Sequence, residues 1–289
     1  MKKKLIGILM SLAVVASLTA CGNSDASTTG DAQTATEGAN IESEDADDPE
    51  AVGEKTTFTV GFDASFPPYG YQDDNGEYVG FDLELAQEVC NRLGYELVKQ
   101  PISWDAKDME LSSGTIDCIW NGFTMNGRED DYCWTEPYLN NSQVFVVAED
   151  SGIKTKADLA RKTVAVQADS SALKALENEE NTDLKNSFAE LLQVPDYNTA
   201  FMNMEAGAVD AVAMDVGVAQ YQIQTRNGGF VILDESLADD EVYGIGFEIS
   251  NTALRDQVQG TLDEMAADGT FTEIATKWGL EDSIILEHE

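Results

Sequence analysis

Apolar and polar positions alternate in short segments once the chain passes Thr57. Phe58–Phe62 has the period-two pattern of a strand, and Tyr69–Val79 predicts two short strands around a turn. The apolar side chains that follow recur with the spacing of one helical face, with Asp82 as the expected N-cap and Gly94 as the expected stop. The folded part of the chain is therefore expected to open with short strands and an amphipathic helix.

Strands and helices are predicted to alternate through the rest of the chain. Strands are expected over Glu96–Lys99, Ile116–Trp120, Gln143–Ala148, Thr163–Gln167, Leu191–Val194, Val209–Met214, Phe230–Leu233 and Val242–Ile249, and helices over Ser170–Glu179, Thr199–Glu205, Val216–Thr225, Ala253–Ala267 and Phe271–Trp278. One pattern occurs twice in the sequence. Ser113–Ile119 and Ala206–Val212 each contain an expected helix end, a glycine and a buried strand that begins with Asp. The alternation is typical of α/β units with mostly parallel sheets, and the repeated pattern suggests two lobes built on one plan.

The N-terminus has the pattern of an export signal. Lys2–Lys4 form a charged start, and the apolar stretch Leu5–Leu18 has 14 residues, against about 20 for a helix that spans a membrane. Residues 1–20 are therefore predicted to be a signal peptide. The stretch closes on Leu18-Thr19-Ala20-Cys21, which resembles the bacterial lipobox and predicts that Cys21 carries diacylglycerol. An ordinary secretory signal with an incidental cysteine is the alternative.

Residues 21–56 are low in complexity and acidic. Gly22–Lys55 holds ten acidic residues, one lysine and no aromatic residue, so it cannot bury enough apolar area to order itself. A coil of this length reaches about 30 Å. We expect a disordered tether that lets a folded domain move above the membrane, and a binding role for the acidic run is the alternative.

Composition and charge narrow the function. The chain has 289 residues, too many for one ordinary core, so two packed units are expected. Its formal net charge of −37 argues against nucleic acid and anionic membrane surfaces as partners, so membrane contact is expected only through the lipid anchor. The single histidine, His288, disfavours Ser-His-Asp catalysis, Cys-His catalysis and histidine-ligated zinc. The acidic turn Asp73–Gly76 lacks the carboxylate spacing of a calcium loop, so no metal or other cofactor is expected.

Eight ordered motifs carry a resemblance to a known family. They are Val60–Tyr69, Val79–Ala86, Gly114–Asp117, Asn121–Thr124, Glu136–Tyr138, Val164–Gln167, Val209–Asp215 and Tyr243–Gly246. From Phe58 to about Gly279 the chain resembles the family 3 solute-binding proteins, the amino-acid receptors of bacterial ABC importers. The resemblance implies a type II periplasmic-binding-protein-like α/β fold with two lobes. Two crossover strands, near Val144–Ala148 and Val242–Phe247, would join residues 57–148 plus 243–289 (lobe one) to residues 149–242 (lobe two).

The same resemblance implies a function. The protein is expected to act as a monomer, bound outside the cell by its lipid anchor, that captures a free amino acid between the lobes and delivers it to a membrane permease. A cyclohexadienyl-dehydratase-like enzyme on the same fold is the alternative, because fold alone does not fix function. Only the receptor needs an acid that faces an α-ammonium group.

A carboxylate clamp is expected around Arg128. It is the only cationic side chain between Lys107 and Lys154, and a guanidinium can hold a carboxylate through two parallel hydrogen bonds. The family resemblance implies this role for Arg128, although the turn before it is one residue shorter than usual. A solvated arginine paired with one of the three acids that follow it is the alternative.

The remaining subsites are expected from both lobes. Ser170 and Ser171 open a helix, where free N–H groups favour an anion, and helix capping is the alternative for Ser170. The resemblance implies that Asp215 binds the ammonium group, with a plain N-cap as its alternative. Thr124 and the carbonyl of Asn121 or Gly122 would complete the backbone subsite.

The side-chain pocket is expected from lobe one. The resemblance implies Asp63 and the rings of Phe66 and Trp104, and Trp120 is open between pocket and core. These groups suit a cationic side chain, or equally a flat, neutral, polar side chain such as that of glutamine or the disulfide of cystine. Since no basic residue besides Arg128 is expected there, acidic amino acids should be rejected. Cys90, Cys118 and Cys133 are expected to be small buried hydrophobic residues, and a Cys118–Cys133 disulfide is the alternative.

Overall fold

Two β-sheets form the centre of the fold. The computed structural model describes residues 56–226 and 228–286, which belong to one compact unit. Ten strands pair in the order β10-β9-β11-β8-β13-β6-β1-β5, with β12 beside β8 and β7 beside β13, while β2, β3 and β4 form a small second sheet. The strands are β1 (Thr57–Phe62), β2 (Ser65–Phe66), β3 (Gly70–Gln72), β4 (Tyr78–Val79), β5 (Glu96–Pro101), β6 (Cys118–Thr124), β7 (Cys133–Trp134), β8 (Leu139–Ala148), β9 (Thr163–Gln167), β10 (Glu190–Val194), β11 (Ala211–Asp215), β12 (Phe230–Ile232) and β13 (Ala238–Phe247).

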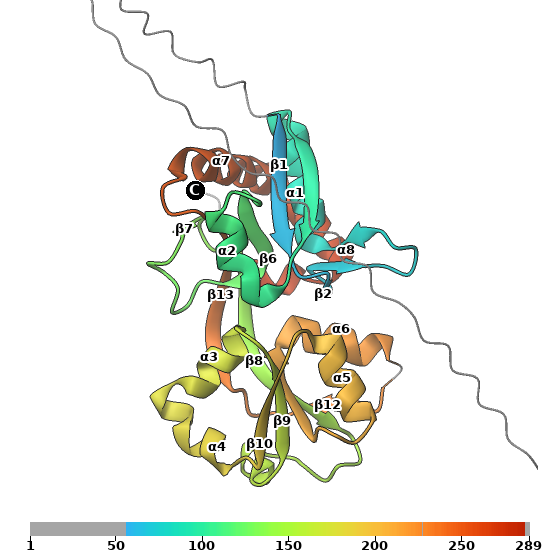
Figure 1. Cartoon of the computed structure of the whole chain (residues 1–289). Coiled ribbons are helices and arrows are strands. Elements are labelled where there is room, and N and C mark those ends of the chain that lie inside the picture. The colour runs from blue at the N-terminus through green and yellow to red at the C-terminus, as the bar shows by residue number, and fades with distance from the viewer. Residues whose placement is uncertain (1–55, 227, 287–289) are drawn as a thin grey trace, which may run out of the picture. The chain divides into compact units, whose positions relative to one another are not determined.

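Lobe one is built on the parallel strands β5, β1 and β6. Helix α1 (Phe81–Leu93) contacts β5 and β6 and packs against α7 (Thr252–Ala267) and α8 (Thr270–Trp278). The short helix α2 (Lys107–Ser112) follows a single 3₁₀ turn, Trp104–Ala106, and contacts β1 and β6. Figure 1 draws these helices at the top of the molecule.

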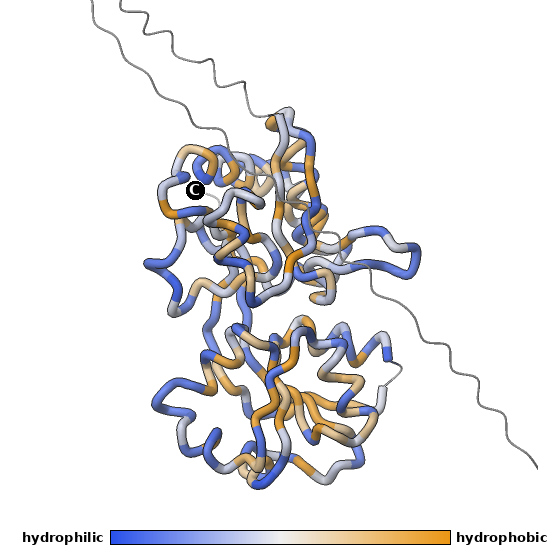
Figure 2. Tube along the Cα trace, viewed as in Figure 1, coloured by the Kyte–Doolittle hydropathy of each residue, from blue (hydrophilic) through white to orange (hydrophobic). Residues whose placement is uncertain are grey.

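Lobe two is built on the parallel strands β10, β9 and β11. Val164 and Val166 of β9 belong to the cluster that includes α3 (Ser171–Glu177), while Ala165 between them belongs to the cluster that includes α5 (Tyr197–Glu205) and α6 (Val216–Thr225). Side chains of a strand alternate between faces, so a strand covered on both sides is apolar throughout. Figure 2 shows these strands as hydrophobic segments inside a more hydrophilic outer layer, to which α4 (Thr182–Ser187) belongs.

Strands β8 and β13 connect the two lobes and are called the crossover strands below. Each has ten residues, and they pair antiparallel with each other, with Tyr243 opposite Leu139 and Glu241 opposite Asn141. β8 continues alongside β11 and β12 of lobe two, while β13 continues alongside β6 and β7 of lobe one. The two-lobed α/β class that was expected is confirmed.

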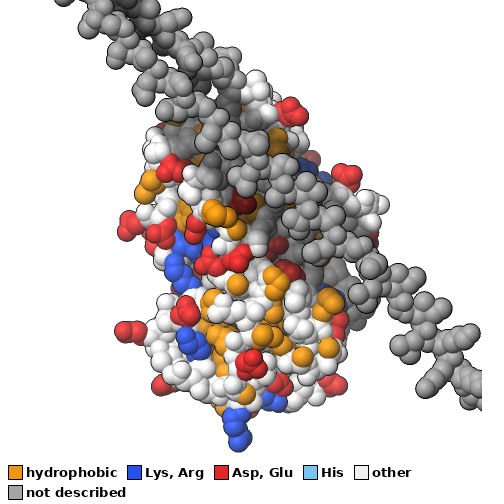
Figure 3. All heavy atoms as spheres, in the orientation of Figure 1, with side chains coloured by type: hydrophobic (Ala, Val, Ile, Leu, Met, Phe, Trp, Pro, Cys, Tyr) orange, Lys and Arg blue, Asp and Glu red, His pale blue; other side chains and the backbone are white. Residues whose placement is uncertain are grey.

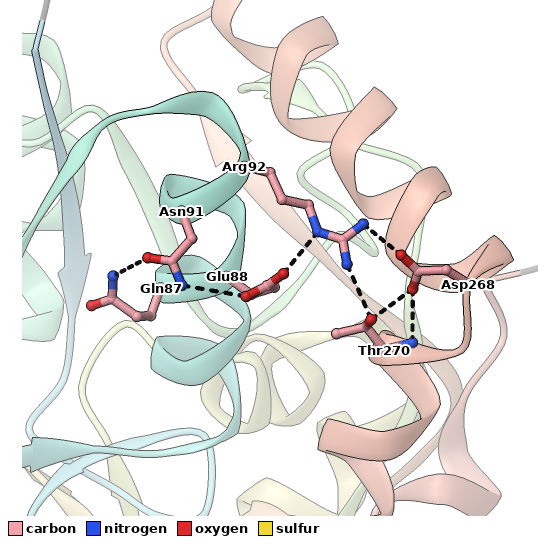
Figure 4. A network of polar contacts seen from close by, with 6 residues as sticks. All are labelled: Gln87, Glu88, Asn91, Arg92, Asp268 and Thr270. Atoms are coloured by element: carbon pink, nitrogen blue, oxygen red, sulfur yellow. Dashed lines mark hydrogen bonds and ion pairs between the residues drawn. The ribbon is translucent and has the colours of Figure 1, made fainter.

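A polar network ties α1 to the turn between α7 and α8 (Figure 4). Arg92 in the last turn of α1 pairs with Glu88 at 2.8 Å and with Asp268 at 2.8 Å, and it donates to the hydroxyl of Thr270. Hydrogen bonds from Thr270 and the ion pair with Arg92 lower the pKa of Asp268 to about 2. One arginine thus joins three helices of lobe one at its surface.

Most predicted elements are confirmed, and two of them, Thr163–Gln167 and Val216–Thr225, have the expected bounds. The short helices α2 and α4 and the strands β2 and β7 were missed. Cys133 is a free thiol, so the disulfide to Cys118 is wrong. The signal peptide, Cys21 and nearly all of the tether lie outside the described residues. No helix in the described ranges combines the length and apolar character needed to cross a membrane.

Asp82 is not the N-cap of α1. Gly80 holds that position with φ 144°, and a Cβ on it would lie 2.2 Å from the carbonyl oxygen of Tyr69, so only glycine fits. The carboxylate of Asp82 is buried instead, where it accepts from the backbone N–H of Gly122 at 2.6 Å and from the hydroxyl of Tyr138 at 2.9 Å. Burial raises its pKa to about 7. Helix α1 therefore carries a buried carboxylate, that of Asp82, which binds the backbone of β6.

Candidate functional site

Arg128 lies at the junction of the lobes and is 6% exposed. Its guanidinium donates to the carbonyl of Thr124 at 3.1 Å, to the hydroxyl of Ser171 at 2.8 Å and to the carbonyl of Asp169 at 3.4 Å. It also lies 5.2 Å from the ring of Phe123. Neutral oxygens and a ring therefore surround a charge that is largely removed from water.

No described carboxylate pairs with this guanidinium. The ion pairs of residues 56–226 and 228–286 do not include Arg128, and the alternative pairing with Glu129, Asp130 or Asp131 is absent from them. A buried guanidinium is normally paired, because transfer of an isolated charge out of water is costly. The arrangement leaves Arg128 able to accept an anionic partner.

The side chains of Ser170 and Ser171 have different hydrogen-bond partners. Ser170 is the N-cap of α3, and its hydroxyl accepts from the backbone N–H of Leu173 at 3.1 Å. Ser171, the first residue of the helix, has its hydroxyl on Arg128. The capping alternative for Ser170 is thus observed, while Ser171 lies against the guanidinium from the opposite lobe.

Asp215 ends β11 in a buried polar cluster. Its Oδ1 accepts from the side-chain amides of Asn141 and Gln143 and from the hydroxyl of Tyr243, each at 2.8 Å. It occupies the N-cap position of α6 but makes no capping hydrogen bond with its side chain, so capping does not explain it. Burial raises the pKa of Asp215, and these three hydrogen bonds oppose the rise.

Glu241 on β13 is a second acid in this cluster, and the sequence analysis missed it. Its Oε2 accepts from Gln143 at 2.7 Å, from Asn141 at 2.8 Å and from the hydroxyl of Thr124 at 3.3 Å. Burial and the nearby charge of Asp215 raise its pKa to about 7. Alternation gives the signal that could have found it, because Asn141 and Gln143 share one face of β8, and Glu241 and Tyr243 share one face of β13.

A cavity of about 240 Å³ borders the cluster. Its lining includes Gly127, Ser171, Lys174 and Glu241. The acid on the crossover strand therefore shares a cavity with the serine that contacts Arg128.

Asp63 follows β1 and bridges the lobes. Its Oδ2 accepts from the side-chain amide of Gln167 at 2.6 Å, its Oδ1 accepts from the N–H of Ser65, and its own N–H donates to the side chain of Asn121 at 3.0 Å. Burial raises the pKa of Asp63 to about 6. An acid of lobe one is thereby held by an amide of lobe two.

Three aromatic rings line the same region. Phe66 and Trp104 are nearly parallel, at 3° and 6.4 Å between centroids, and Tyr197 of lobe two lies 5.9 Å from Phe66. A layer of atoms between two rings needs about 7 Å, twice a carbon contact distance, so a small movement would admit one. Trp120 is fully buried within the large core cluster, which makes the core alternative the better interpretation.

Lys107 is a buried cation in lobe one, where the sequence analysis expected no basic residue besides Arg128. Its side chain is 2% exposed, lies 5.4 Å from the ring of Trp104 and pairs with Asp169 of lobe two, which is 51% exposed. The chain therefore places a second buried cation beside the aromatic rings, where none was expected. It is already neutralised across the junction.

Position 122 of β6 requires a glycine. Its φ of 54° is left-handed, and a Cβ there would meet the rings of Phe66, Tyr243 and Tyr69 at 3.0–3.1 Å. Its N–H is held by Asp82, and the adjacent Asn121 side chain by the backbone of Asp63. Asn121, Gly122 and Thr124 thus end β6 beside the aromatic rings and Glu241.

The predicted site residues come together at one junction between the lobes. Asp63, Phe66, Trp104, Asn121, Gly122, Thr124 and Arg128 belong to lobe one, and Ser170, Ser171 and Asp215 belong to lobe two. Acidic side chains elsewhere are spread over the face that Figure 3 draws rather than gathered in one patch. Among the described residues, no group of three or more His, Cys, Asp or Glu side chains is placed to hold a metal ion.

One known protein family matches most of this chain. Residues 58–281 match the model of the bacterial extracellular solute-binding proteins, family 3. The chain belongs to this family. The resemblance read from the sequence is confirmed, and membership agrees with a location outside the cytoplasm.

Two similar proteins are named as cystine-binding proteins. The L-cystine-binding protein TcyJ of Escherichia coli (strain K12) is 29% identical over 231 residues, which cover 78% of this chain and 84% of that protein. The L-cystine-binding protein TcyA of Bacillus subtilis (strain 168) is 28% identical over 285 residues, which cover 98% of this chain and 99% of that protein.

Solved structures share the fold. A substrate-binding protein of an ABC uptake transporter from Streptococcus pneumoniae, with bound histidine, has a TM-score of 0.75 at 32% identity over 79% of this chain and 94% of that one. The protein Tv2483 bound to L-arginine has a TM-score of 0.75 at 28% identity, over 80% and 94% of the two chains. An ancestral amino-acid-binding protein, a precursor of cyclohexadienyl dehydratase, has a TM-score of 0.69 at 27% identity over 77% and 95%. The first and third of these are named as binding proteins, and the second is a complex with an amino acid.

Proposed function

We propose that this protein captures a free amino acid outside the cell and delivers it to the permease of an ABC importer. The observation that carries the proposal is Arg128, a buried guanidinium with no described carboxylate partner, in contact with Ser171 of the other lobe. An α-carboxylate would complete it, since a guanidinium holds a carboxylate through charge-assisted hydrogen bonds. Contacts from both lobes to one small anion require the lobes to be closed around it.

Asp215 is the proposed partner of the α-ammonium group. The three hydrogen bonds described for its side chain all go to Oδ1, which leaves Oδ2 to face a cation. A ligand ammonium beside Asp215 would favour its charged form and offset the burial that raises its pKa. The carbonyl of Asn121 or Gly122 and the hydroxyl of Thr124 are proposed to complete the backbone subsite.

The proposed ligand class is a polar or cationic amino acid. Asp63 supplies negative charge for a cationic side chain, and Phe66 with Trp104 supplies two parallel ring faces. Relatives and neighbours that bind cystine, histidine and arginine support this class. Lys107 removes one argument against acidic ligands, but its pairing with Asp169 still leaves a second ligand carboxylate without a free cation.

The anchoring and the lobe bounds are part of the proposal. Residues 1–20 would be the signal peptide, Cys21 the lipidated residue and residues 21–56 the tether. Lobe one would comprise residues 57–148 and 243–289, and lobe two residues 149–242. The protein would work as a monomer held to the outer face of the membrane.

A thermal-shift screen tests the proposal. The twenty amino acids, ornithine and cystine are added singly to the purified protein, and a bound ligand at 100 times its Kd stabilises by about 2.7 kcal/mol. We expect a polar or cationic amino acid to raise the melting temperature most. Arg128→Ala should weaken its binding by about thirtyfold or more, because the ligand carboxylate loses its charged partner.

The Lys277→Ala variant, which removes an exposed cation of α8 that pairs with Glu84, is the control and should keep most of the affinity. No stabilisation by any amino acid would refute the proposed function. Strongest stabilisation by glutamate or aspartate would refute the side-chain pocket alone.

A further inference from the structure

Tyr197 has a buried hydroxyl without a hydrogen-bond partner among the described residues. It is the first residue of α5, its side chain is 0% exposed, and its oxygen makes no hydrogen bond to any described residue. The helix start is fixed, because the N-cap Asp196 accepts from the backbone N–H of Thr199 at 2.8 Å and from its hydroxyl at 3.0 Å. The position of Tyr197 is therefore set by its helix rather than by its own hydroxyl.

The ring of Tyr197 extends the aromatic wall of the proposed site. It lies 5.9 Å from Phe66 at an interplanar angle of 37°, and Phe66 in turn is parallel to Trp104. Phe66 and Trp104 belong to lobe one, whereas Tyr197 belongs to lobe two. The third ring thus reaches the site from the opposite side of the junction.

The groups around Tyr197 are acidic. Burial raises the pKa of its hydroxyl well above the ordinary value, and the charges of Asp215, Asp63 and Glu241 add to this rise. Ser170 is the neutral polar neighbour and opposes this rise, but no hydrogen bond joins it to Tyr197, and its hydroxyl oxygen accepts from the backbone N–H of Leu173. The phenol donates to none of the three carboxylates, so its lone pairs and its proton are both available.

An unpaired buried hydroxyl carries the full desolvation penalty of a polar group, whereas a phenylalanine ring would fill the same space without it. A tyrosine is therefore useful here only if a bound molecule pairs with it. A ligand carboxylate beside three acids would be repelled, while a nitrogen cation would be attracted. The surroundings favour a ligand N–H that donates to the phenol oxygen.

We infer that Tyr197 is a specificity-determining residue of the amino-acid site, whose hydroxyl accepts a hydrogen bond from a nitrogen cation of the bound amino acid. This inference rests on the proposed function. It assigns a ligand contact to a helix of lobe two, beyond the residues that the sequence indicated.

The Tyr197→Phe variant tests the inference. Calorimetric titration uses the amino acid that stabilises the wild-type protein most in the screen described above. A hydrogen bond to a charged group is worth about a tenfold to hundredfold change in affinity, so the variant should bind at least about tenfold more weakly. The melting temperature of the empty variant should be unchanged or higher, because an unpaired polar group has been removed.

Tyr138→Phe is the matched control. Tyr138 is also fully buried, but its hydroxyl donates to Oδ1 of Asp82, while Gly122 is held by the other oxygen. This variant should melt at a lower temperature and bind with nearly wild-type affinity, the reverse of Tyr197→Phe.

Equal affinity of the wild-type and Tyr197→Phe proteins would overturn the inference and leave the proposed function intact. A melting temperature of empty Tyr197→Phe as low as that of Tyr138→Phe would also overturn it, since the hydroxyl would then have an internal partner. A wild-type protein that binds no amino acid would instead refute the proposed function, and the inference with it.

Discussion

Glu241 should make the empty protein less stable as the pH rises. Burial and the charge of Asp215 raise its pKa from 4.5 to about 7. Between these values the folded protein holds a proton at Glu241 that the unfolded chain has already released, so each increase in pH favours unfolding. The stability associated with this proton is fully present below about pH 4.5 and is lost as the pH rises through about 7.

The magnitude follows from the size of the shift. One pKa unit corresponds to about 1.4 kcal/mol, and Glu241 is only 6% exposed, so screening by water is small. The shift is therefore worth about 3 kcal/mol, a large part of the stability of an ordinary domain. Glu241→Gln removes the titrating group and keeps the size of the side chain.

Urea denaturation of the empty protein between pH 4.5 and 8.5 measures this effect. The stability of Glu241→Gln minus that of the wild-type protein should grow by about 3 kcal/mol across the range. The difference between the two proteins is the informative quantity, because acids that do not interact with Glu241 titrate equally in both. Glu136→Gln, at an exposed acid, is the matched control and should run parallel to wild type. A difference that stays constant with pH would refute the reasoning.

Three further outcomes are expected. Cys21→Ala should release the protein from membranes or block its maturation, and a variant that stays in the membrane fraction at wild-type mobility would contradict lipidation. Small-angle scattering should give a smaller radius of gyration with a saturating amino acid, since contacts from both lobes form together only on closure; an unchanged radius would contradict a closing receptor. Asp169→Asn should speed ligand dissociation by about tenfold or more, because it strands buried Lys107 without its partner. Lys107→Met leaves only the half-exposed Asp169, so it should change the rate less than about threefold, and equal effects would contradict this account.

Local pattern predicted the elements that have strong local signals. Thr163–Gln167 is apolar on both faces and became a buried strand with the expected bounds. The helices Lys107–Ser112 and Thr182–Ser187 were missed because six residues are too few to show a helical period. Asp82 was assigned as an N-cap because its partners, Gly122 and Tyr138, are 40 and 56 residues away in the chain.

The candidate site shows the same difference between residues with a local sequence signal and residues whose role depends on distant partners. Residues in motifs, such as Arg128 and Asp215, were proposed from the sequence, and the structure places them at one junction. Glu241, Lys107 and Tyr197 were missed because burial defines their roles, and burial depends on packing between the lobes. A glutamate in an acidic chain or a lysine on a short helix is usually a solvated side chain, so its residue type gave no signal.

The crossover strands carry side chains of the site as well as the connection between the lobes. Asn141 and Gln143 on β8 and Glu241 on β13 form one hydrogen-bonded cluster with Asp215. A substitution at any of these three positions would change the polarity of the candidate site and the hydrogen bonds of the connection at once. Under the proposed function, substitutions at these positions would therefore change selectivity and the rate of opening together. Phe66 and Trp104 lie off the crossover strands, so substitutions there would leave the hydrogen-bonded cluster of the connection intact.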